Sequence, residues 1–313
     1  MLNLHKRSRQ IDDPQDVIRP TLDELIRMNL PAKSIELARS TARALQSGQY
    51  FSAFKGRGME FDEARPYAHG DDIRSLDWRV TARTGKVHTK LFREERERPV
   101  FVSVDLRASM FFATRGMYKS ALATRLGSLI AWSAAHHGDR IGGQVFSESG
   151  SLEFKPKEGH ASVLRILRSL AERSAQPENS RGNPDSLDRA INELHRHVKP
   201  GSLVFIISDF RGLGVAGAQS LGRLSRQSTV VLIMISDVLE RDLPLGMLRF
   251  GTPQEDRMIL GDEKSRQMHL ERFTAREEEI RKLARGYRMR FVSGWTHEEP
   301  ILILQRTLRN AKG

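Results

Sequence analysis

The 313-residue sequence contains no cysteine, which excludes disulfide bonds, thiolate metal sites and thiol catalysis. It also lacks long apolar runs, since no window approaches the ~18 to 20 apolar residues that a transmembrane helix requires. The most apolar stretches, Leu203 to Ile207 and Val230 to Ile235, have the length of strands. The first residues carry no apolar segment typical of a secretory signal. We therefore expect a cytoplasmic protein that makes no use of a membrane.

Tyr and Trp are few, at four and three residues, and offer little material for stacking against bases. The formal net charge is +12, a value that calls for a nucleic-acid hypothesis. However, 51 basic residues are mixed with 39 acidic ones, and no helix-turn-helix, RNP, KH or zinc-finger pattern is present. Specific nucleic-acid binding is therefore not expected, and an acidic protein partner explains the charge equally well.

Strand and helix patterns alternate along residues 99–313, the largest of three expected regions. Such an alternation predicts an α/β domain whose mainly parallel sheet carries helices on both faces. We expect about six strands, with Val100 to Asp105 at the centre and Val204 to Ile207 away from any edge. The other expected strands and the hairpin lie at 141–146, 152–154 (a short antiparallel companion), 229–236, 288–293, and 247–250 with 257–260.

Two smaller regions precede this domain. Residues 1–48 have apolar positions at helical spacing and predict a helical segment, with Thr21 as an N-cap and Pro31 as a break. Residues 49–98 predict a small β-containing insert, in which 84–86 resembles a hairpin turn that leads into a strand.

A dense polar block within the insert includes Asp71, Asp72, Arg74, Asp77 and Trp78. In an enzyme, its carboxylates would serve as acid-base or metal-binding groups. The alternative is a capped turn with a structural or interface role, in which Asp71 or Asp72 caps a short helix. In that turn the acids pair with nearby arginines and Trp78 is a buried anchor. We favour the structural interpretation, because acids so rich in neighbouring arginines are usually paired.

A second motif follows the first strand of the large domain. That strand ends in Asp105, and Ser109 comes four residues later, while Asp209 directly follows the strand at 202–208. The carboxyl ends of parallel strands are where α/β domains place ligand or metal sites. We therefore expect these three side chains to lie near one another.

Together, the Gly70-Asp71-Asp72-Ile73-Arg74-Ser75-Leu76-Asp77-Trp78 block and the strand that ends in Asp105 resemble the bacterial DUF58 family. The resemblance implies a von Willebrand factor A-like, Rossmann-like domain. It also implies a metal-ion-dependent adhesion site, where Asp105, Ser109 and Asp209 would bind Mg²⁺ through oxygens. A threonine ligand is expected at 158–162, but only Ser162 is available there.

Arg107 stands where that family pattern has a serine ligand. A guanidinium cannot bind Mg²⁺ and repels it at close range. We hypothesise that Arg107 lies between Asp105 and Asp209 as an internal counter-ion, which makes the metal site degenerate. The alternatives are a weakened Mg²⁺ site, and an Arg107 side chain that points into solvent.

The resemblance implies a non-enzymatic interaction module, an adaptor or co-chaperone of a MoxR-type AAA+ ATPase, with other von Willebrand factor A proteins as further partners. The rim around Asp105, Ser109 and Asp209 would be the docking surface. The alternative is a metal-dependent hydrolase or phosphotransferase that uses Asp105 and Asp209 with the Asp71–Asp72 pair. Against it, the sequence shows no recognisable nucleophile-base pair.

Overall fold

The computed structural model describes residues 19–37, 59–69, 71, 73–94, 99–175, 185–251 and 256–309. The chain divides into two compact units, one of residues 1–38 and 98–313 and one of residues 39–97. The N-terminal residues 19–37 therefore belong to the larger unit.

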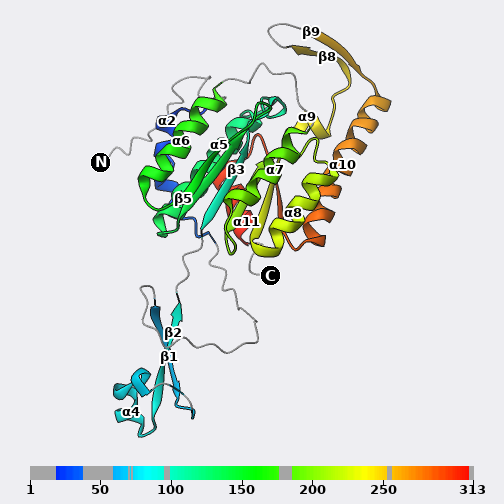
Figure 1. The fold of residues 1–313 in the computed structure, drawn as a ribbon. Helices are drawn as coiled ribbons and strands as arrows, with labels where there is room; N and C mark the ends of the chain where they lie inside the picture. Colours follow the sequence, from blue (N-terminus) through cyan, green and yellow to red (C-terminus); the bar gives the residue numbers. More distant parts are fainter. Residues whose placement is uncertain are drawn as a thin grey trace, which may run out of the picture. The chain divides into compact units, whose positions relative to one another are not determined.

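The larger unit is built on a six-stranded sheet in the order β10-β7-β6-β3-β4-β5 (Figure 1). All neighbouring strands are parallel except β5, which pairs antiparallel with β4 at one edge. The prediction of a mainly parallel sheet with Val100 to Asp105 in its interior is confirmed, as is the interior position of Val204 to Ile207. The strands are β3 (Val100–Asp105), β4 (Ile141–Phe146), β5 (Ser151–Lys157), β6 (Leu203–Ser208), β7 (Thr229–Ser236) and β10 (Arg290–Trp295).

The two central strands are mostly apolar up to their polar ends because each face of the sheet is covered; the buried exception, Ser103, donates to Gln144 Oε1 at 2.8 Å. In β3, Val100, Val102 and Val104 enter one core, whereas Phe101 enters the other. This alternation follows from the two-residue period of a strand, and burial on both faces explains why most of its residues are apolar.

Helices from distant parts of the chain cover each face. One core is closed by α2 (Leu22–Arg27), α3 (Asn29–Ala32), α5 (Lys119–His136), α6 (His160–Ser174) and α11 (Pro300–Arg309). The other is closed by α7 (Ser186–His197), α8 (Val215–Gln227) and α10 (Glu263–Gly286). The short α9 (Val238–Arg241) follows β7, and β8 (Gly246–Gly251) pairs with β9 (Asp256–Gly261) as the predicted hairpin.

The N-terminal helix α2 is attached to α5 by polar as well as apolar contacts. Thr21 caps it as predicted, with its Oγ1 accepting from the Glu24 N–H at 3.2 Å. The indole of Trp132 donates to the Leu25 carbonyl at 3.0 Å, and Arg125 pairs with Glu24 at 2.6 Å. Pro31 lies inside α3 instead of ending the first helix, which stops at Arg27. The predicted helical positions from residue 38 onward lie outside the described residues.

The smaller unit contains an antiparallel pair, β1 (Met59–Pro66) and β2 (His88–Glu94). A 3-10 turn, η1 (Ile73–Ser75), and the helix α4 (Trp78–Thr84) connect the two strands. Gly85 ends α4 with φ of 70°, a left-handed conformation that glycine adopts without steric cost. The predicted hairpin turn at residues 84–86 is therefore wrong, because these residues form the end of a helix. No helix among the described residues of either unit is long and apolar enough to cross a membrane.

Candidate functional site

The candidate site lies in the larger unit, at the carboxyl ends of the central strands. Asp105 is the last residue of β3, Asp209 follows β6, and Asp237 follows β7. All three carboxylates are fully buried, with an exposure of 0%. Because β3, β6 and β7 are parallel neighbours, their carboxyl ends meet at one edge of the sheet, as the sequence led us to expect.

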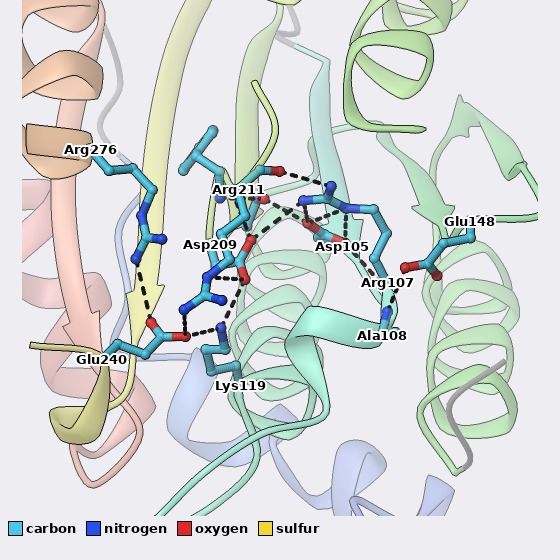
Figure 2. A network of polar contacts seen from close by, with 11 residues as sticks. Asp105, Arg107, Ala108, Lys119, Glu148, Asp209, Arg211, Glu240 and Arg276 are labelled. Carbon is cyan, nitrogen blue, oxygen red and sulfur yellow. Dashed lines mark hydrogen bonds and ion pairs between the residues drawn. The ribbon is translucent and has the colours of Figure 1, made fainter. Parts of the chain in front are cut away.

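Arg107 lies between Asp105 and Asp209, and Figure 2 shows its guanidinium directed at both. Its Nε is 3.0 Å from each carboxylate oxygen of Asp105, and its Nη2 is 2.7 Å from Asp105 Oδ2 and 3.4 Å from Asp209 Oδ1. Its Nη1 donates to the Arg211 carbonyl at 3.0 Å. Arg107 is 6% exposed and therefore has the position expected of an internal counter-ion, not that of a solvent-exposed side chain.

A second cation, Lys119, reaches the same carboxylates from the first turn of α5. Its Nζ lies 2.8 Å from Asp209 Oδ2 and 2.6 Å from Glu240 Oε1, and the side chain is fully buried. The sequence analysis missed this residue. One signal was available, because a lysine at the amino end of an apolar helix is unfavourable beside the helix dipole unless acidic groups compensate it.

Further charges continue the network away from the strand ends (Figure 2). Arg211 Nη2 lies 2.9 Å from Glu240 Oε1, and Arg276 Nη2 lies 3.7 Å from Glu240 Oε2. On the other side of Arg107, Glu148 Oε1 accepts from the Ala108 N–H at 2.8 Å. The network of Asp105, Asp209, Glu240 and Glu148 with Arg107, Lys119, Arg211 and Arg276 thus combines four carboxylates with four cations. We call it the ion-pair network.

These pairings change the proton affinities of the buried groups. Burial by itself raises the pKa of Asp209, but the charges of Lys119 and Arg107 outweigh burial and hold that pKa well below the usual value for aspartate. Burial lowers the pKa of Arg107, but the carboxylates of Asp105, Asp209 and Glu148 together raise it by more, so that the net shift is upward. Asp209 and Arg107 therefore both remain charged at neutral pH.

Local backbone geometry supports the same arrangement. Ser208 Oγ donates to Asp105 Oδ2 at 2.6 Å and accepts from the Phe210 N–H at 2.9 Å. Phe210 has φ of 53°, which is uncommon for a bulky residue and stores backbone strain next to Asp209. The third aspartate, Asp237, accepts hydrogen bonds from Thr114 and Thr296, which tie neighbouring loops together.

The side chains present do not fit a divalent cation between Asp105 and Asp209. Arg107 and Lys119 already lie against the oxygens that would bind Mg²⁺, and two buried positive charges oppose a third. Among the described residues, no group of three or more His, Asp or Glu side chains is arranged to hold a metal. The hydroxyl of Ser109 is buried and makes no hydrogen bond within the described structure. Of the predicted ligands Asp105, Ser109 and Asp209, Ser109 is the one whose oxygen is not engaged by Arg107 or Lys119.

The expected position of the threonine-ligand loop at 158–162, where only Ser162 was available, is wrong. Because β5 runs antiparallel to β4, it carries the chain back to the amino ends of the parallel strands. Ser162 follows β5 in α6, where its hydroxyl donates to the Glu158 carbonyl at 3.2 Å. The loop between β4 and β5 lies at the correct edge instead, and it supplies Glu148.

A pocket of about 550 Å³ adjoins the ion-pair network. Arg211 and Glu240 are part of the ion-pair network and also line the pocket. Ser109, whose hydroxyl makes no hydrogen bond within the described structure, lines it as well. Apolar side chains supply much of the wall, and arginines lie among them. The lining residues are Ala108, Ser109, Phe111, Phe112, Arg211, Leu239, Glu240, Leu243, Ser265, Met268, His269 and Arg272.

In the smaller unit, the acids of the polar block stabilise the local backbone. Asp71 pairs with Arg65 at 2.6 Å and accepts from the Ala68 N–H at 2.8 Å; that backbone bond, together with Arg65, lowers the pKa of Asp71. Asp77 is the N-cap of α4. Its Oδ1 accepts from the Arg79 N–H at 3.0 Å and from the Val80 N–H at 3.1 Å. The helix therefore begins after Asp77 and is not capped by Asp71. Asp72 lies outside the described residues.

The expectation that Trp78 is a buried anchor is wrong, because 67% of this residue is exposed. It occupies the first position of α4, and a two-stranded sheet with one short helix provides little apolar surface to cover an indole. The polar block thus separates into structural acids and an exposed aromatic residue. Arg74, in η1, is also exposed.

Comparison with known proteins places the chain in a family. Residues 63–282 match the family described as "Protein of unknown function DUF58". The chain is 27% identical over 232 residues to uncharacterized proteins of Mycobacterium bovis and Mycobacterium tuberculosis, over 74% of this chain and 72% of each relative.

A crystal structure of an aerotolerance-related membrane protein from Bacteroides fragilis, with multiple mutations to serines, aligns with a TM-score of 0.42 and 13% identity. The alignment covers 69% of this chain and 98% of that one, and a likeness at this level carries no conclusion about fold or function. The family match, in contrast, extends over more than half of the sequence. The chain therefore belongs to the DUF58 family.

Proposed function

We propose that the protein is a non-enzymatic, protein-binding module, and that it serves as an adaptor or co-chaperone of a MoxR-type AAA+ ATPase. The observation that carries the proposal is the saturation of the strand-end carboxylates by buried cations. Asp105 and Asp209 hold Arg107 and Lys119 at hydrogen-bonding distances, so their charges serve to fix the loops of this edge. The ATPase partnership itself comes from the family resemblance and is a proposal at that level.

The same saturation argues against a metal-dependent hydrolase or phosphotransferase. Such an enzyme needs carboxylates that bind a metal or accept a proton during the reaction. The pKa of Asp209 is held far below neutrality, which makes it a weak base. Both oxygens of Asp105 are engaged by Arg107, and Oδ2 also accepts from Ser208. In addition, Asp71 is engaged with Arg65 in the other unit.

The edge of the sheet is proposed to act as a degenerate adhesion site of a von Willebrand factor A-like domain. In such a site the metal would present a positive charge to an acidic ligand; here, Arg107 and Lys119 supply positive charge but are buried. In the same network, the side chain of Arg211 is 44% exposed to solvent. Arg211 lines the pocket, as does Arg272. A partner that inserts an apolar side chain next to a carboxylate fits this combination. Other von Willebrand factor A proteins are further candidate partners.

The direct test is binding between this chain and the MoxR-type ATPase of the same host, both purified, measured with ATP, with ADP and without nucleotide. Co-purification from the host, with and without ATP, identifies the physiological partner. We expect a stoichiometric complex whose affinity depends on the nucleotide. Absence of binding in all three states would overturn the ATPase partnership.

Pocket involvement is tested by Met268→Glu, which adds a charge to the pocket wall at a residue that is already 43% exposed. Leu302→Glu is the matched control, because Leu302 is 56% exposed on α11 and lies outside the pocket lining. We expect the first variant to weaken ATPase binding and the second to leave it unchanged. Equal effects would show that the pocket is not the docking surface.

A further inference from the structure

The smaller unit exposes three large apolar side chains that its own fold does not cover. Trp78 is 67% exposed, Ile73 is 68% exposed and Val87 is 44% exposed. Single exposed apolar residues are ordinary, but an exposed tryptophan is uncommon because burying its large side chain is strongly favourable. These three residues lie within 16 positions of sequence, in or beside η1, α4 and β2.

The backbone that carries Trp78 is held at both ends. Asp77 caps the amino end of α4, and the Asp77 N–H donates to the His88 carbonyl of β2 at 2.8 Å. At the other end the Gly85 N–H returns to the Thr81 carbonyl at 2.9 Å, and the Thr81 hydroxyl accepts from the His88 N–H at 3.1 Å. The indole is thus displayed on a fixed scaffold, which lowers the entropy lost when a partner binds.

The surroundings of Trp78 are positively charged. Residues 73–88 contain four Lys or Arg residues and one acid, Asp77, whose carboxylate is used as the helix cap. Arg79 and Arg83 are exposed and four residues apart, so they form a row along α4 next to the row of Trp78 and Ala82. Tryptophan and arginine are the residue types most enriched at the energetic centres of protein interfaces.

We propose that the exposed face of α4, defined by Trp78, Arg79, Ala82 and Arg83, binds an acidic segment of a partner protein that places an apolar side chain against the indole. Charge complementarity selects the acids of that segment, and the indole provides the apolar anchor. This surface shares no residue with the pocket of the larger unit, and the inference does not depend on the identity of the ATPase partner.

Two other classes of macromolecule fit the face less well. Single-stranded nucleic acid is bound by several stacking residues along a basic groove, whereas residues 73–88 contain one aromatic side chain of the Phe, Tyr or Trp type. Membrane-surface helices present a broad apolar face, and the seven residues of α4 present one tryptophan.

The test uses a random-peptide display library selected on the full chain and then depleted on the Trp78→Ala variant. We expect peptides that carry Asp or Glu on both sides of an aromatic or leucine residue. Synthetic versions should lose roughly thirtyfold in affinity for Trp78→Ala, the effect of one strong interface residue. Trp78→Phe should retain most of the binding, and Arg79→Glu with Arg83→Glu should weaken it and reduce its salt dependence.

Matched controls separate this surface from the pocket. Leu302→Ala removes an apolar side chain that is 56% exposed on the larger unit, and both it and Met268→Glu should bind the peptides as the unchanged chain does. Thermal melting of each variant verifies folding.

The proposal is overturned if no peptide depends on Trp78 or if the dependent peptides lack acids. It is also overturned if Trp78-dependent binding is found only with a single-stranded oligonucleotide or with phosphatidylserine vesicles. Loss of self-association in Trp78→Ala, seen by sedimentation velocity, would assign the face to a second copy instead.

Discussion

Lys119 and Asp209 form an ion pair that joins the amino end of α5 to the carboxyl end of β6, with 2.8 Å between Nζ and Oδ2 and both side chains fully buried. Glu240 shares the same ammonium at 2.6 Å. Taking these charges out of water is costly, so each depends on its partners to remain in the interior. Several of the predictions below follow from that dependence.

Replacing Lys119 with Met should lower the free energy of unfolding by about 3–5 kcal/mol, because it leaves Asp209 and Glu240 buried with fewer cations. Urea denaturation at neutral pH measures the change. Arg266→Met is the control, because the Arg266–Asp242 pair is exposed and should contribute about 0–1 kcal/mol. Similar losses in both variants would contradict the assignment of Lys119 as a buried counter-ion.

Replacing Arg107 with Ser should create Mg²⁺-dependent stabilisation, because it restores a ligand oxygen and removes a charge between Asp105 and Asp209. The unchanged chain should bind Mg²⁺ weakly or not at all. The metal-free variant should be less stable, since two neighbouring carboxylates lose a shared cation. Melting curves with and without Mg²⁺ measure both effects.

Lys119 should limit the gain in Arg107→Ser, because its ammonium still occupies Asp209. The double variant with Lys119→Met should therefore respond more strongly to Mg²⁺. Arg211→Ser removes a charge from the network without placing an oxygen between the two aspartates and should show no response. Stoichiometric, tight Mg²⁺ binding by the unchanged chain would refute the counter-ion interpretation.

Acid should destabilise the larger unit partly through Asp209. Its pKa in the folded chain lies well below the value of about 3.9 expected when unfolded, so its contribution is complete above the unfolded pKa. The contribution is lost as the pH falls below about 4 toward the folded pKa, since the unfolded chain binds the proton first.

Urea denaturation over this pH range should show a shallower pH dependence for Asp209→Asn than for the unchanged chain. Asp242→Asn, at a carboxylate whose side chain is 54% exposed, serves as the control and should leave the slope unchanged. If the free energy of unfolding has the same pH dependence in all three proteins, Asp209 does not contribute to acid destabilisation.

The tryptophans should differ sharply in their contributions to stability. Trp132→Ala should cost about 3–5 kcal/mol, because Trp132 is 3% exposed and donates to the Leu25 carbonyl. Trp78→Ala should change the free energy of unfolding by less than about 0.5 kcal/mol, as for other exposed positions. Chemical denaturation of the two variants checks both values. A large loss for Trp78→Ala would show that its indole is covered in the folded protein.

The central sheet was predictable because its signals are local. A mostly apolar segment that ends in an acid, as in Val100 to Asp105, marks a strand buried on both faces, and the alternation with helices determines the parallel arrangement. The position of Arg107 followed from the family pattern, in which it replaces a serine ligand of the site that contains Asp105 and Asp209. Lys119 and Glu240 were not found, because 90 and 31 residues separate them from Asp209 and only the fold brings them together.

Two errors have different physical origins. The segment at 152–154 was expected to be antiparallel to its neighbour. An antiparallel strand carries the chain to the opposite edge of the sheet, so the loop that follows it, with Ser162, could not reach the site. Trp78 was assigned to a core by residue type alone. Whether a large side chain is covered depends on how much apolar surface surrounds it, and the described part of the smaller unit, with two strands and a seven-residue helix, has little.

The guanidinium between Asp105 and Asp209 belongs to the chain itself, two residues from one of its partners. A metal ion in such a position exchanges with the medium, is removed by chelators and varies with the ion's concentration. A side chain has no dissociation constant and arrives with the folding of its own loop. This guanidinium is therefore encoded in the sequence, one per chain, and its presence between the two carboxylates does not depend on the concentration of a metal ion around the protein.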